Sequence, residues 1–228
     1  MEDRKTDREI SDLLLRACHD LRTPSRAVRT YSELILKDGA AGRNAEMEHR
    51  LGFLVDGARK IDVILDGLVN YSLALQIDPA GFQRVRMDIL LRGVLMKVGV
   101  ALREAGGEVE AGELPEVTGQ HERLTQLMEQ LLRNAIEHRG EAAPRIQVEA
   151  MRQDNAWQFT VHDNGPGIDA DYLERIFLPF ERLHKTAQSG AGMGLATCRA
   201  IVERHGGRIH AEAPAGGGTT FRFTIPAL

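Results

Sequence analysis

Two runs of apolar residues with coiled-coil spacing occupy most of the first 75 residues and limit what the chain can fold into. Their steps alternate between three and four, the heptad pattern of a helix that packs against another helix. The first seam consists of Leu14, Ala17, Leu21, Pro24, Val28, Tyr31 and Ile35, and the second of Leu51, Leu54, Ala58, Ile61, Leu65, Leu68, Ser72 and Leu75. A polar break with Asp38, Gly39 and Gly42 separates them and indicates a turn. We therefore predict an all-α helical hairpin.

A single hairpin covers only half of each apolar stripe. Two hairpins paired into a four-helix bundle cover both stripes, so a homodimer is the economical arrangement. The helical pattern stops around Asp78-Pro79-Ala80-Gly81, residues that favour a turn. We predict a hairpin domain over residues 1–77, a linker over 78–84 and a second domain over 85–228.

The second half of the chain mixes helical and strand periodicities. Helices are predicted over residues 90–102, around an apolar arc in residues 124–135, and after Gly194. Alternating runs at 146–150, 157–161, 209–213 and 221–225 predict strands. Because the strands come in consecutive pairs with helices between them, we expect an α/β sandwich with helices on one face of a mixed sheet.

Charge and composition exclude several classes of protein. The formal net charge of −4, without local basic runs, gives no field for nucleic acid. No apolar stretch reaches the roughly 18–20 residues that a membrane span needs, and residues 1–9 are too polar for a signal peptide. Cys18 and Cys198 have no metal-ligand spacing and are interpreted as reduced thiols. We expect a cytoplasmic protein.

His19 lies about 200° around the first helix from the apolar seam, so it is expected to point to solvent. The neighbouring Asp20 can accept a ring N–H, fix the tautomer and raise the basicity of the other nitrogen. Thr23 lies one turn on and shares the His19 face. Pro24 cannot donate to the carbonyl of Asp20, which makes the helix easy to bend there. Taken alone, a surface histidine on a helix is usually just solvated.

Residues 19–24, His-Asp-Leu-Arg-Thr-Pro, resemble the H-box of the histidine kinases. In that box an acidic residue follows the phosphoacceptor histidine, and an Arg-Thr-Pro or similar run closes it. The resemblance implies that His19 is the phosphoacceptor and Asp20 its general base. Thr23 would help to place a water when the kinase acts in reverse as a phosphatase on its partner.

Asp163 shares the parity of Phe159 and Val161, so it should project from the apolar face of the sheet at a strand end. A carboxylate is costly to bury without a donor, and an adenine amine would supply one. Gly165 and Gly167 would let a ligand approach the backbone. The commoner use of Asp-Asn-Gly-Pro-Gly is a tight turn.

Residues 190–195, Gly-Ala-Gly-Met-Gly-Leu, open a predicted helix whose first N–H groups can bind phosphate. The run fits neither the dinucleotide fingerprint nor the P-loop. Asn134 and Gln130 lie on the border of the apolar arc, and His138 falls within it by periodicity. A border asparagine can supply an amide oxygen to Mg²⁺. An amide that bridges within the domain is the more common alternative.

In this order and spacing the clusters resemble the ATP-binding domain shared by histidine kinases, DNA gyrase and mismatch-repair ATPases. The matches are the N-box at residues 132–138, glycine boxes at 163–168, 190–195 and 216–221, and an F-box at 177–180. The F-box occurs in the kinases rather than in the other ATPases, and the resemblance covers residues 10–226. Residues 180–184 and 201–207 look most like the phytochrome-associated kinases, whose upstream sensor domain is not in this chain.

The resemblance implies that residues 1–77 are the dimerisation and phosphotransfer domain and residues 85–228 the catalytic domain. Asn134 would ligate Mg²⁺, Asp163 would read the adenine, and Thr219 would support the adenine pocket. The implied ATP-binding residues are Asn134, His138, Arg139, Asp163, Gly165, Gly167, Ile168, Phe180, Arg182, Gly190, Gly192, Gly194, Leu195 and Thr219. Gly192 and Gly194 would face the phosphates.

Residues 181–189 would form a mobile lid whose base Phe177 and Phe180 pack. The chain departs from the family pattern at Gln130, where another Asn is usual, and at Glu137, where a Lys often contacts phosphate. We expect that the missing positive charge is supplied by Arg133, Arg139 or Arg182.

The function implied is that of a sensor histidine kinase in a two-component system. It would phosphorylate His19 from Mg-ATP and pass the phosphoryl group to an Asp of a response regulator receiver domain, with a reverse phosphatase activity. An ATP-binding dimeric scaffold without turnover is the alternative that Gln130 and Glu137 favour. A plain ATPase in the manner of gyrase is a second, which the H-box and F-box oppose. The handedness of the turn over residues 39–44 would decide between phosphorylation in cis and in trans.

Overall fold

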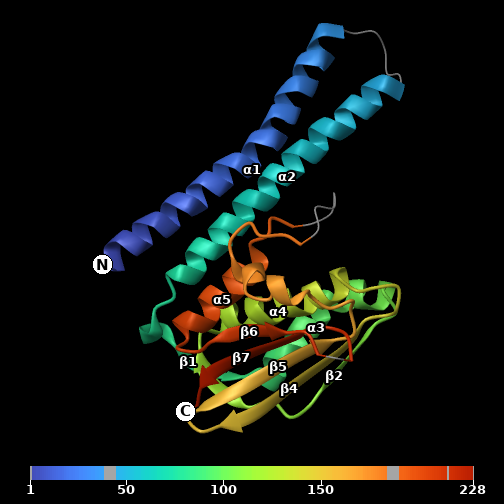
Figure 1. The fold of residues 1–228 in the computed structure, drawn as a ribbon. Coiled ribbons are helices and arrows are strands. Elements are labelled where there is room, and N and C mark those ends of the chain that lie inside the picture. The colour runs from blue at the N-terminus through green and yellow to red at the C-terminus, as the bar shows by residue number, and fades with distance from the viewer. Residues whose placement is uncertain (1, 39–44, 184–189, 215, 228) are drawn as a thin grey trace. The chain divides into compact units, whose positions relative to one another are not determined.

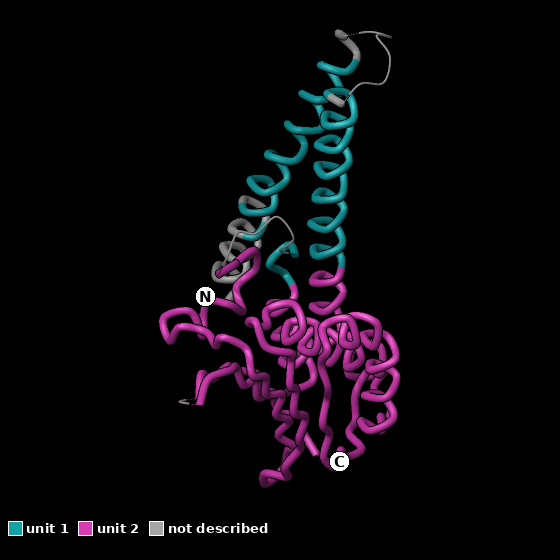
Figure 2. The backbone as a smooth tube through the Cα atoms, turned by 90° about the vertical axis from the view of Figure 1, so that its right-hand side faces the viewer, with its two compact units in different colours: residues 1–69, 184–193 teal, residues 70–183, 194–228 magenta. Residues whose placement is uncertain are grey.

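The computed structural model describes residues 2–38, 45–183, 190–214 and 216–227, and in the first helix the side chains of residue 13 and residues 16–35. The chain divides into two compact units, residues 1–69 with 184–193 and residues 70–183 with 194–228 (Figure 2). The turn over 39–44 lies outside the described residues. The predicted boundaries at residues 77 and 85 remain predictions.

Helices α1 (Glu2–Asp38) and α2 (Ala45–Leu75) lie side by side, as predicted for a hairpin (Figure 1). The rings of Tyr31 and Phe53 stack with their centroids 4.7 Å apart. A Cβ on Gly57 would lie 2.9 Å from a methyl group of Val28, so a side chain here would push the helices apart. Pro24 lies inside α1 and is buried.

The predicted α2 seam differs from the buried face of this helix. Leu65 and Leu75 are 46% and 39% exposed, whereas Ile64 and Ala74 are buried. A heptad seam assumes one partner along the whole helix. The last turn of α2 belongs instead to the second unit, where Ala74 is part of the hydrophobic core. The buried face is therefore offset from the predicted seam, at Gly57 and Ile64 within the first unit as well as at Ala74 in the second. Of the α1 seam, the side chain of Leu14 lies outside the described residues.

The second unit contains a mixed five-stranded sheet of order β2-β4-β5-β7-β6. Strands β2 and β4 pair in parallel, whereas the β4–β5, β5–β7 and β6–β7 pairs are antiparallel. These strands are β2 (Glu108–Ala111), β4 (Arg145–Gln153), β5 (Ala156–Asp163), β6 (Ile209–Glu212) and β7 (Thr220–Pro226). A separate antiparallel pair joins β1 (Gln83–Arg86) to β3 (Glu116–Gly119). The predicted mixed sheet is confirmed, whereas the four-residue strands β1, β2 and β3 were not predicted.

The helices of this unit cover one face of the sheet, as expected for the predicted sandwich (Figure 1). They are α3 (Met87–Glu104), α4 (His121–Glu137) and α5 (Gly194–Arg204). The described part of this unit also contains the short 3-10 helices η1 (Pro79–Gly81), η2 (Ala170–Tyr172) and η3 (Arg175–Phe177).

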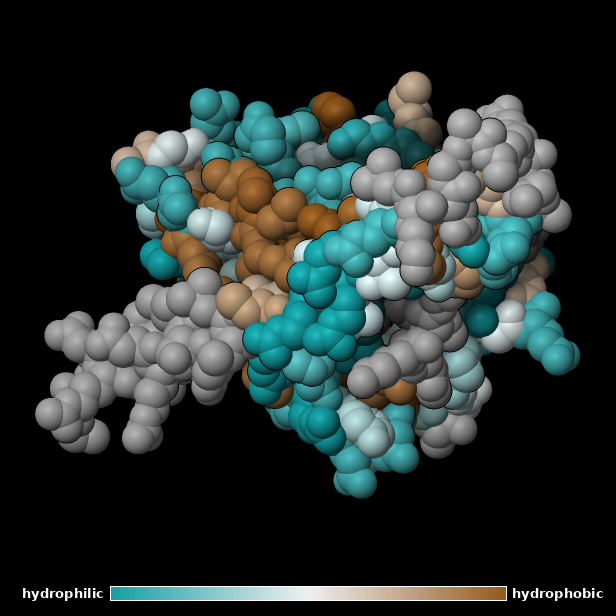
Figure 3. Space-filling view, turned by 90° about the horizontal axis from the view of Figure 1, so that it is seen from above, coloured by the Kyte–Doolittle hydropathy of each residue, from teal (hydrophilic) through white to brown (hydrophobic). Residues whose placement is uncertain are grey.

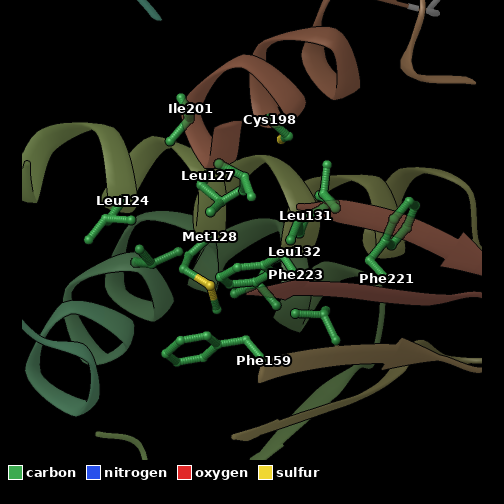
Figure 4. Packing of buried hydrophobic residues seen from close by; sticks show 14 of the residues in the cluster. Leu124, Leu127, Met128, Leu131, Leu132, Phe159, Cys198, Ile201, Phe221 and Phe223 are labelled. Carbon is green, nitrogen blue, oxygen red and sulfur yellow. The ribbon is translucent and has the colours of Figure 1, made fainter. Parts of the chain in front are cut away.

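The hydrophobic core lies between these helices and the sheet (Figure 4). Phe159 of β5 and Phe223 of β7 stack with ring centroids 4.9 Å apart. The fully buried side chains of α4 are Leu124, Leu127, Met128, Leu131 and Leu132. This packing fixes the rotation of α4 about its axis, and with it the direction of the border residues Gln130 and Asn134.

Candidate nucleotide site and phosphoacceptor helix

Asp163 is the last residue of β5, and its carboxylate is buried as the strand parity predicts. Its Oδ1 accepts hydrogen bonds from the backbone N–H groups of Gly165 at 2.8 Å and Thr219 at 3.2 Å. Burial raises the pKa of this carboxyl group above its ordinary value, and the two N–H donors offset part of the rise. Within the part of the chain that the structure describes, both of these hydrogen bonds use one oxygen of the buried acid.

The first and third glycine boxes meet around Asp163. Gly218 donates its N–H to the carbonyl of Gly165 at 3.0 Å, and Asp163 donates its N–H to the carbonyl of Thr219 at 2.9 Å. Gly218 has φ +80°, and a Cβ there would run into the backbone oxygen of Asp163. Gly167 has φ +81°, and its Cβ would lie 3.1 Å from the Gly218 carbonyl oxygen. Glycine is therefore required where the two boxes cross.

The N-box lies beside the start of α5. Gln130 donates from Nε2 to Oδ1 of Asn134 at 2.9 Å, across one turn of α4. A Cβ on Gly194 would lie 2.5 Å from the Gln130 amide nitrogen, so this glycine makes room for the glutamine. A Cβ on Gly165 would in turn lie 3.2 Å from the backbone oxygen of His138, the residue that follows α4. Asn134, Asp163 and Gly194 are thus gathered at one end of the α4–α5 layer.

The predicted place of His138 within the apolar arc is wrong. Helix α4 ends at Glu137, and His138 is its exposed C-cap with φ −99° and ψ 20°. Arg139 helps to end the helix, because its Nη1 donates to the carbonyl of Ile136 at 2.8 Å. Burial raises the pKa of Asp163, and the nearby His162 and, less strongly, His138 oppose this rise. Roles of His138 and Arg139 toward a nucleotide remain predictions.

The F-box contacts Arg199 of α5, a residue that the sequence did not indicate as its partner. Phe177 is buried, and the Arg199 guanidinium lies 4.4 Å from its ring centroid. Arg199 also donates to Glu174 at 3.1 Å, on the segment just before η3. Phe180 has a left-handed φ of +63°, which a non-glycine residue rarely adopts. The contact of Arg199 with Phe177 could not be predicted from the sequence, because the two residues lie on different elements and far apart along the chain.

Of the other residues predicted to bind the nucleotide, some are buried in the second unit, and others lie beside residues outside the described part of the chain or in the first unit. Thr219 is buried, and Ile168 and Leu195 pack against the core. Arg182 is half-buried at the start of the predicted lid, of which residues 184–189 lie outside the described residues. Gly190 and Gly192 belong to the first compact unit, so their phosphate contacts remain predictions.

His19 faces solvent on α1, as predicted, with 81% of its side chain exposed. Its Nδ1 lies 3.2 Å from Oδ1 of Asp20, and Thr23 is exposed one turn further on. A hydrogen bond of this kind holds the Nδ1–H tautomer and leaves the Nε2 lone pair toward water. The helix therefore presents a nucleophilic nitrogen whose orientation a carboxylate fixes.

Residues 119–228 match the family model described as histidine kinase-, DNA gyrase B- and HSP90-like ATPase. The catalytic domain of the histidine kinase ThkA is 30% identical, with a TM-score of 0.57, and the match covers 95% of that domain and 64% of this chain. This chain belongs to the histidine kinases. The predicted F-box, which separates the kinases from the other ATPases, agrees with this assignment.

Cyanobacterial relatives extend the match to the helical part of this histidine kinase. The phytochrome-like protein Cph1 of Synechocystis is 34% identical over 213 residues, 92% of this chain and 28% of the relative. ThkA in complex with the response regulator TrrA has a TM-score of 0.68 at 21% identity, over 99% of this chain and 64% of that one, which shows a common fold. The predicted resemblance to phytochrome-associated kinases is confirmed. The chain spans less than a third of the length of these phytochrome relatives.

A cavity of about 420 Å³ lies near the end of β5 opposite Asp163. Its lining residues are Glu113, Leu114, Pro115, Glu116, Ala150, Arg152, Trp157 and Ala227, none of which was predicted to bind the nucleotide. Among the described residues, no cluster of three or more His, Cys, Asp or Glu is placed to hold a metal ion. None of the helices described has the length and apolar character needed to cross a bilayer.

Proposed function

We propose that this histidine kinase phosphorylates its own His19 from Mg-ATP and passes the phosphoryl group to an aspartate of a response regulator. The observation that carries the proposal is the exposed His19 imidazole, held by Asp20 at 3.2 Å. It lies on the helical part of a chain whose other part has the histidine kinase ATPase fold. Because the reaction consumes ATP, we propose the cytoplasm as its location.

The chemistry at His19 follows from the tautomer. With the Nδ1–H donated to Asp20, the Nε2 lone pair attacks the γ-phosphorus of ATP. The N–P bond forms while the bond from phosphorus to the β,γ-bridging oxygen breaks, and ADP leaves with that electron pair. The Asp20 carboxylate balances the positive charge that develops on the ring. An aspartate of the receiver domain then takes the phosphoryl group from Nε2.

In the nucleotide unit, Gly165 and Thr219 donate to Oδ1 of Asp163. The other oxygen, Oδ2, would accept a hydrogen bond from the exocyclic amine of adenine. Asn134 offers an amide oxygen, a hard ligand of the type that Mg²⁺ takes together with substrate phosphates. Bound Mg²⁺ would neutralise charge on the β- and γ-phosphates during transfer. This donor set fits a nucleotide-bound Mg²⁺, which needs few protein ligands.

Homodimerisation through α2 is part of the proposal. This helix leaves eight large apolar side chains exposed, which are Leu51, Phe53, Val55, Val63, Leu65, Val69, Leu73 and Leu75. Hydrophobic residues also gather in a contiguous patch on the face drawn in Figure 3. Pairing with a second hairpin would cover such side chains, of which Leu51, Leu65 and Leu75 belong to the predicted seam. ThkA, which shares the fold, has been seen bound to a response regulator, which supports a receiver domain as partner.

The test is incubation of the full chain with labelled ATP and Mg²⁺, followed by treatment with acid and with base. The label should be lost in acid and retained in base, because a phosphorus–nitrogen bond is acid-labile. Label that survives in a His19→Ala variant would reject the site, and acid-stable label would reject the chemistry. The matched control is His49→Ala, which removes another exposed histidine of the hairpin and should keep the label.

A dimeric ATP-binding scaffold without turnover is a second candidate, favoured by one observation. The Gln130 amide donates to the same Asn134 oxygen that would ligate Mg²⁺. A scaffold of this kind would bind ATP in calorimetry without incorporating label at His19. Incorporation at His19 by the unmodified chain would exclude it.

A further inference from the structure

His205 is a buried histidine that the nucleotide site does not use. It follows the last turn of α5 and is 4% exposed. The backbone N–H of Gln120 donates to Nε2 at 3.0 Å, so the ring proton is on Nδ1, which donates to the carbonyl of Ile201 at 2.7 Å. Both ring nitrogens are therefore committed, and the tautomer is fixed by backbone groups of two different elements.

One face of the ring is covered by Phe82. The two rings stack almost in parallel, with centroids 4.5 Å apart and 9° between their planes. A Cβ on Gly119 would lie 2.8 Å from Cδ2 of His205, so the imidazole leaves no room for a side chain there. The ring is thus confined by its neighbours as well as by its hydrogen bonds.

Phe82 ends the segment that joins α2 to β1, and that segment is folded. Asp78 caps η1 by accepting from the N–H of Ala80 at 2.9 Å, and Phe82 donates its N–H to the carbonyl of Pro79 at 3.1 Å. Ile77, immediately before the segment, is 4% exposed and lies in the core of the second unit. The boundary between the compact units falls earlier still, at Val69 and Asn70 within α2.

Helices α4 and α5 run in opposite directions past each other. Gln120 at the start of α4 lies beside His205 after the end of α5, and Gln130 further along α4 lies beside Gly194 at the start of α5. The end of this helix pair at Gln130 and Gly194 carries Asn134 and the glycine box of residues 190–195. The opposite end, at Gln120 and His205, holds the segment that comes from α2.

We infer that His205 is a positioning residue that fastens residues 78–82, through the Phe82 ring, to the α4–α5 pair. This segment then moves as part of the nucleotide-binding unit instead of acting as a free tether. Any bending of α2 between the two units then falls before residues 70–77, because Ala74 and Ile77 lie in the core of the second unit. The inference rests on contacts within one unit and holds whether or not His19 is phosphorylated.

The test is amide hydrogen exchange of the full chain carrying Phe82→Ala, with Phe82→Tyr as the ring-preserving control. Loss of the ring pair should speed exchange at Ala80, Gly81 and Phe82 by about tenfold, with α4 and α5 unchanged. The Kd for ATP should stay within about twofold of the parent, because the nucleotide residues lie at the other end of the helix pair. Phe82→Tyr should restore slow exchange.

Three outcomes would overturn the inference. One is parental exchange over residues 80–82 in the alanine variant, which would mean that the ring does not hold the segment. Another is a uniform rise across α4 and α5, which would make Phe82 an ordinary core residue. The third is the same local rise in Leu102→Ala, which truncates a different half-buried side chain of this unit. If Phe82→Ala fails to fold, Phe82→Leu keeps apolar bulk without a ring and should show a smaller local rise.

A kinetic readout separates positioning from simple stabilisation. If the chain phosphorylates His19, freeing the segment should change the rate at saturating ATP several-fold while the Kd for ATP is kept. A rate change that only follows nucleotide affinity would contradict the positioning role. The absence of any phosphorylation would sink the proposed function, and the exchange data would still decide the inference.

Discussion

Gln130 and Asn134 lie one turn apart on α4, and Gln130 Nε2 donates a hydrogen bond to Asn134 Oδ1 at 2.9 Å. This bond turns the asparagine oxygen toward the glutamine. Gln130 itself lies against the start of α5, where a Cβ at position 194 would lie 2.5 Å from its amide nitrogen. Gln130 departs from the family N-box, and its longer side chain contacts both Asn134, through the hydrogen bond, and the start of α5 at Gly194.

Shortening this amide tests its effect on the metal site. Because the Gln130 donor competes with Mg²⁺ for the Asn134 oxygen, Gln130→Asn should tighten Mg-ATP binding by about fivefold, the worth of one hydrogen bond. Calorimetry with Mg²⁺ and again with a chelator measures it, and ATP binding without metal should not change. Weaker Mg-ATP binding in the variant would show that Gln130 orients Asn134 productively.

Removing the charge of Asp163 should weaken binding and stabilise the empty protein. The folded state raises the pKa of this buried acid, so stability is highest when the group is neutral and falls as pH rises through that pKa. At neutral pH, Asp163→Asn keeps an oxygen for the Gly165 and Thr219 N–H groups without the buried charge. We expect ATP affinity to fall at least tenfold and Tm to rise by about 2–4 °C.

Calorimetry and thermal melting measure the two effects of Asp163→Asn. The control Asp171→Asn removes the charge of an exposed acid and should change neither quantity. A variant of Asp163 that melts lower than the parent would contradict the account of burial. A variant that binds ATP as well as the parent would remove Asp163 from the adenine site.

The third glycine box offers a graded series. Gly216→Ala should be nearly neutral, because a Cβ there meets open space. Gly217→Ala should cost about 1 kcal/mol, because φ is +88° but the space is open. Gly218→Ala should cost more than about 3 kcal/mol, because strain at φ +80° adds to a clash with the Asp163 backbone. Urea unfolding measures the series, and equal costs at 217 and 218 would contradict the crossing of the two boxes.

Periodicity was enough to predict the hairpin and the mixed sheet, because each long element repeats its pattern over several turns or residue pairs. The strands β1, β2 and β3 have four residues each, too few for alternation to stand out. The end of α4 was missed for a related reason. The apolar spacing continues through His138, whereas the helix stops at Glu137, where the Arg139 side chain caps the Ile136 carbonyl.

The direction of a site residue could be predicted from the sequence where the periodicity of its own helix or strand determines it. The parity of β5 placed Asp163 on the buried face, and the α1 seam turned His19 outward. Contacts that depend on tertiary packing left no trace in the sequence. Gln130 against Gly194, Arg199 over Phe177, and His205 between Gln120 and Phe82 join residues far apart along the chain.

Acid should destabilise the protein in part through His205. Burial lowers the pKa of this imidazole, although the Ile201 carbonyl opposes the shift. As pH falls, the unfolded chain therefore binds a proton at this histidine before the folded chain does. The contribution of His205 to the free energy of unfolding is complete above the unfolded pKa of about 6.5, and it decreases as pH falls toward the pKa of the folded state. We expect a slope of up to about 1.4 kcal/mol per pH unit in that window.

Urea unfolding between about pH 7.5 and 5.5 measures this slope. His205→Gln should be less stable near neutral pH and lose its part of the slope. His121→Gln, which changes an exposed histidine, should keep the parental slope. An unchanged slope in His205→Gln would show that the buried ring does not resist protonation.

The carboxylate beside His19 should matter for transfer and not for ATP binding. Asp20→Asn keeps the size of the side chain but loses the charge that balances the ring, so label incorporation at His19 should slow by about 10²-fold. ATP affinity should be unchanged, because Asp20 and Asp163 belong to different compact units. The control Glu33→Gln removes an exposed acid further along α1 and should leave the rate near parental. An Asp20→Asn variant that labels at the parental rate would show that the 3.2 Å contact is incidental, and the tautomer argument for Nε2 would fail with it.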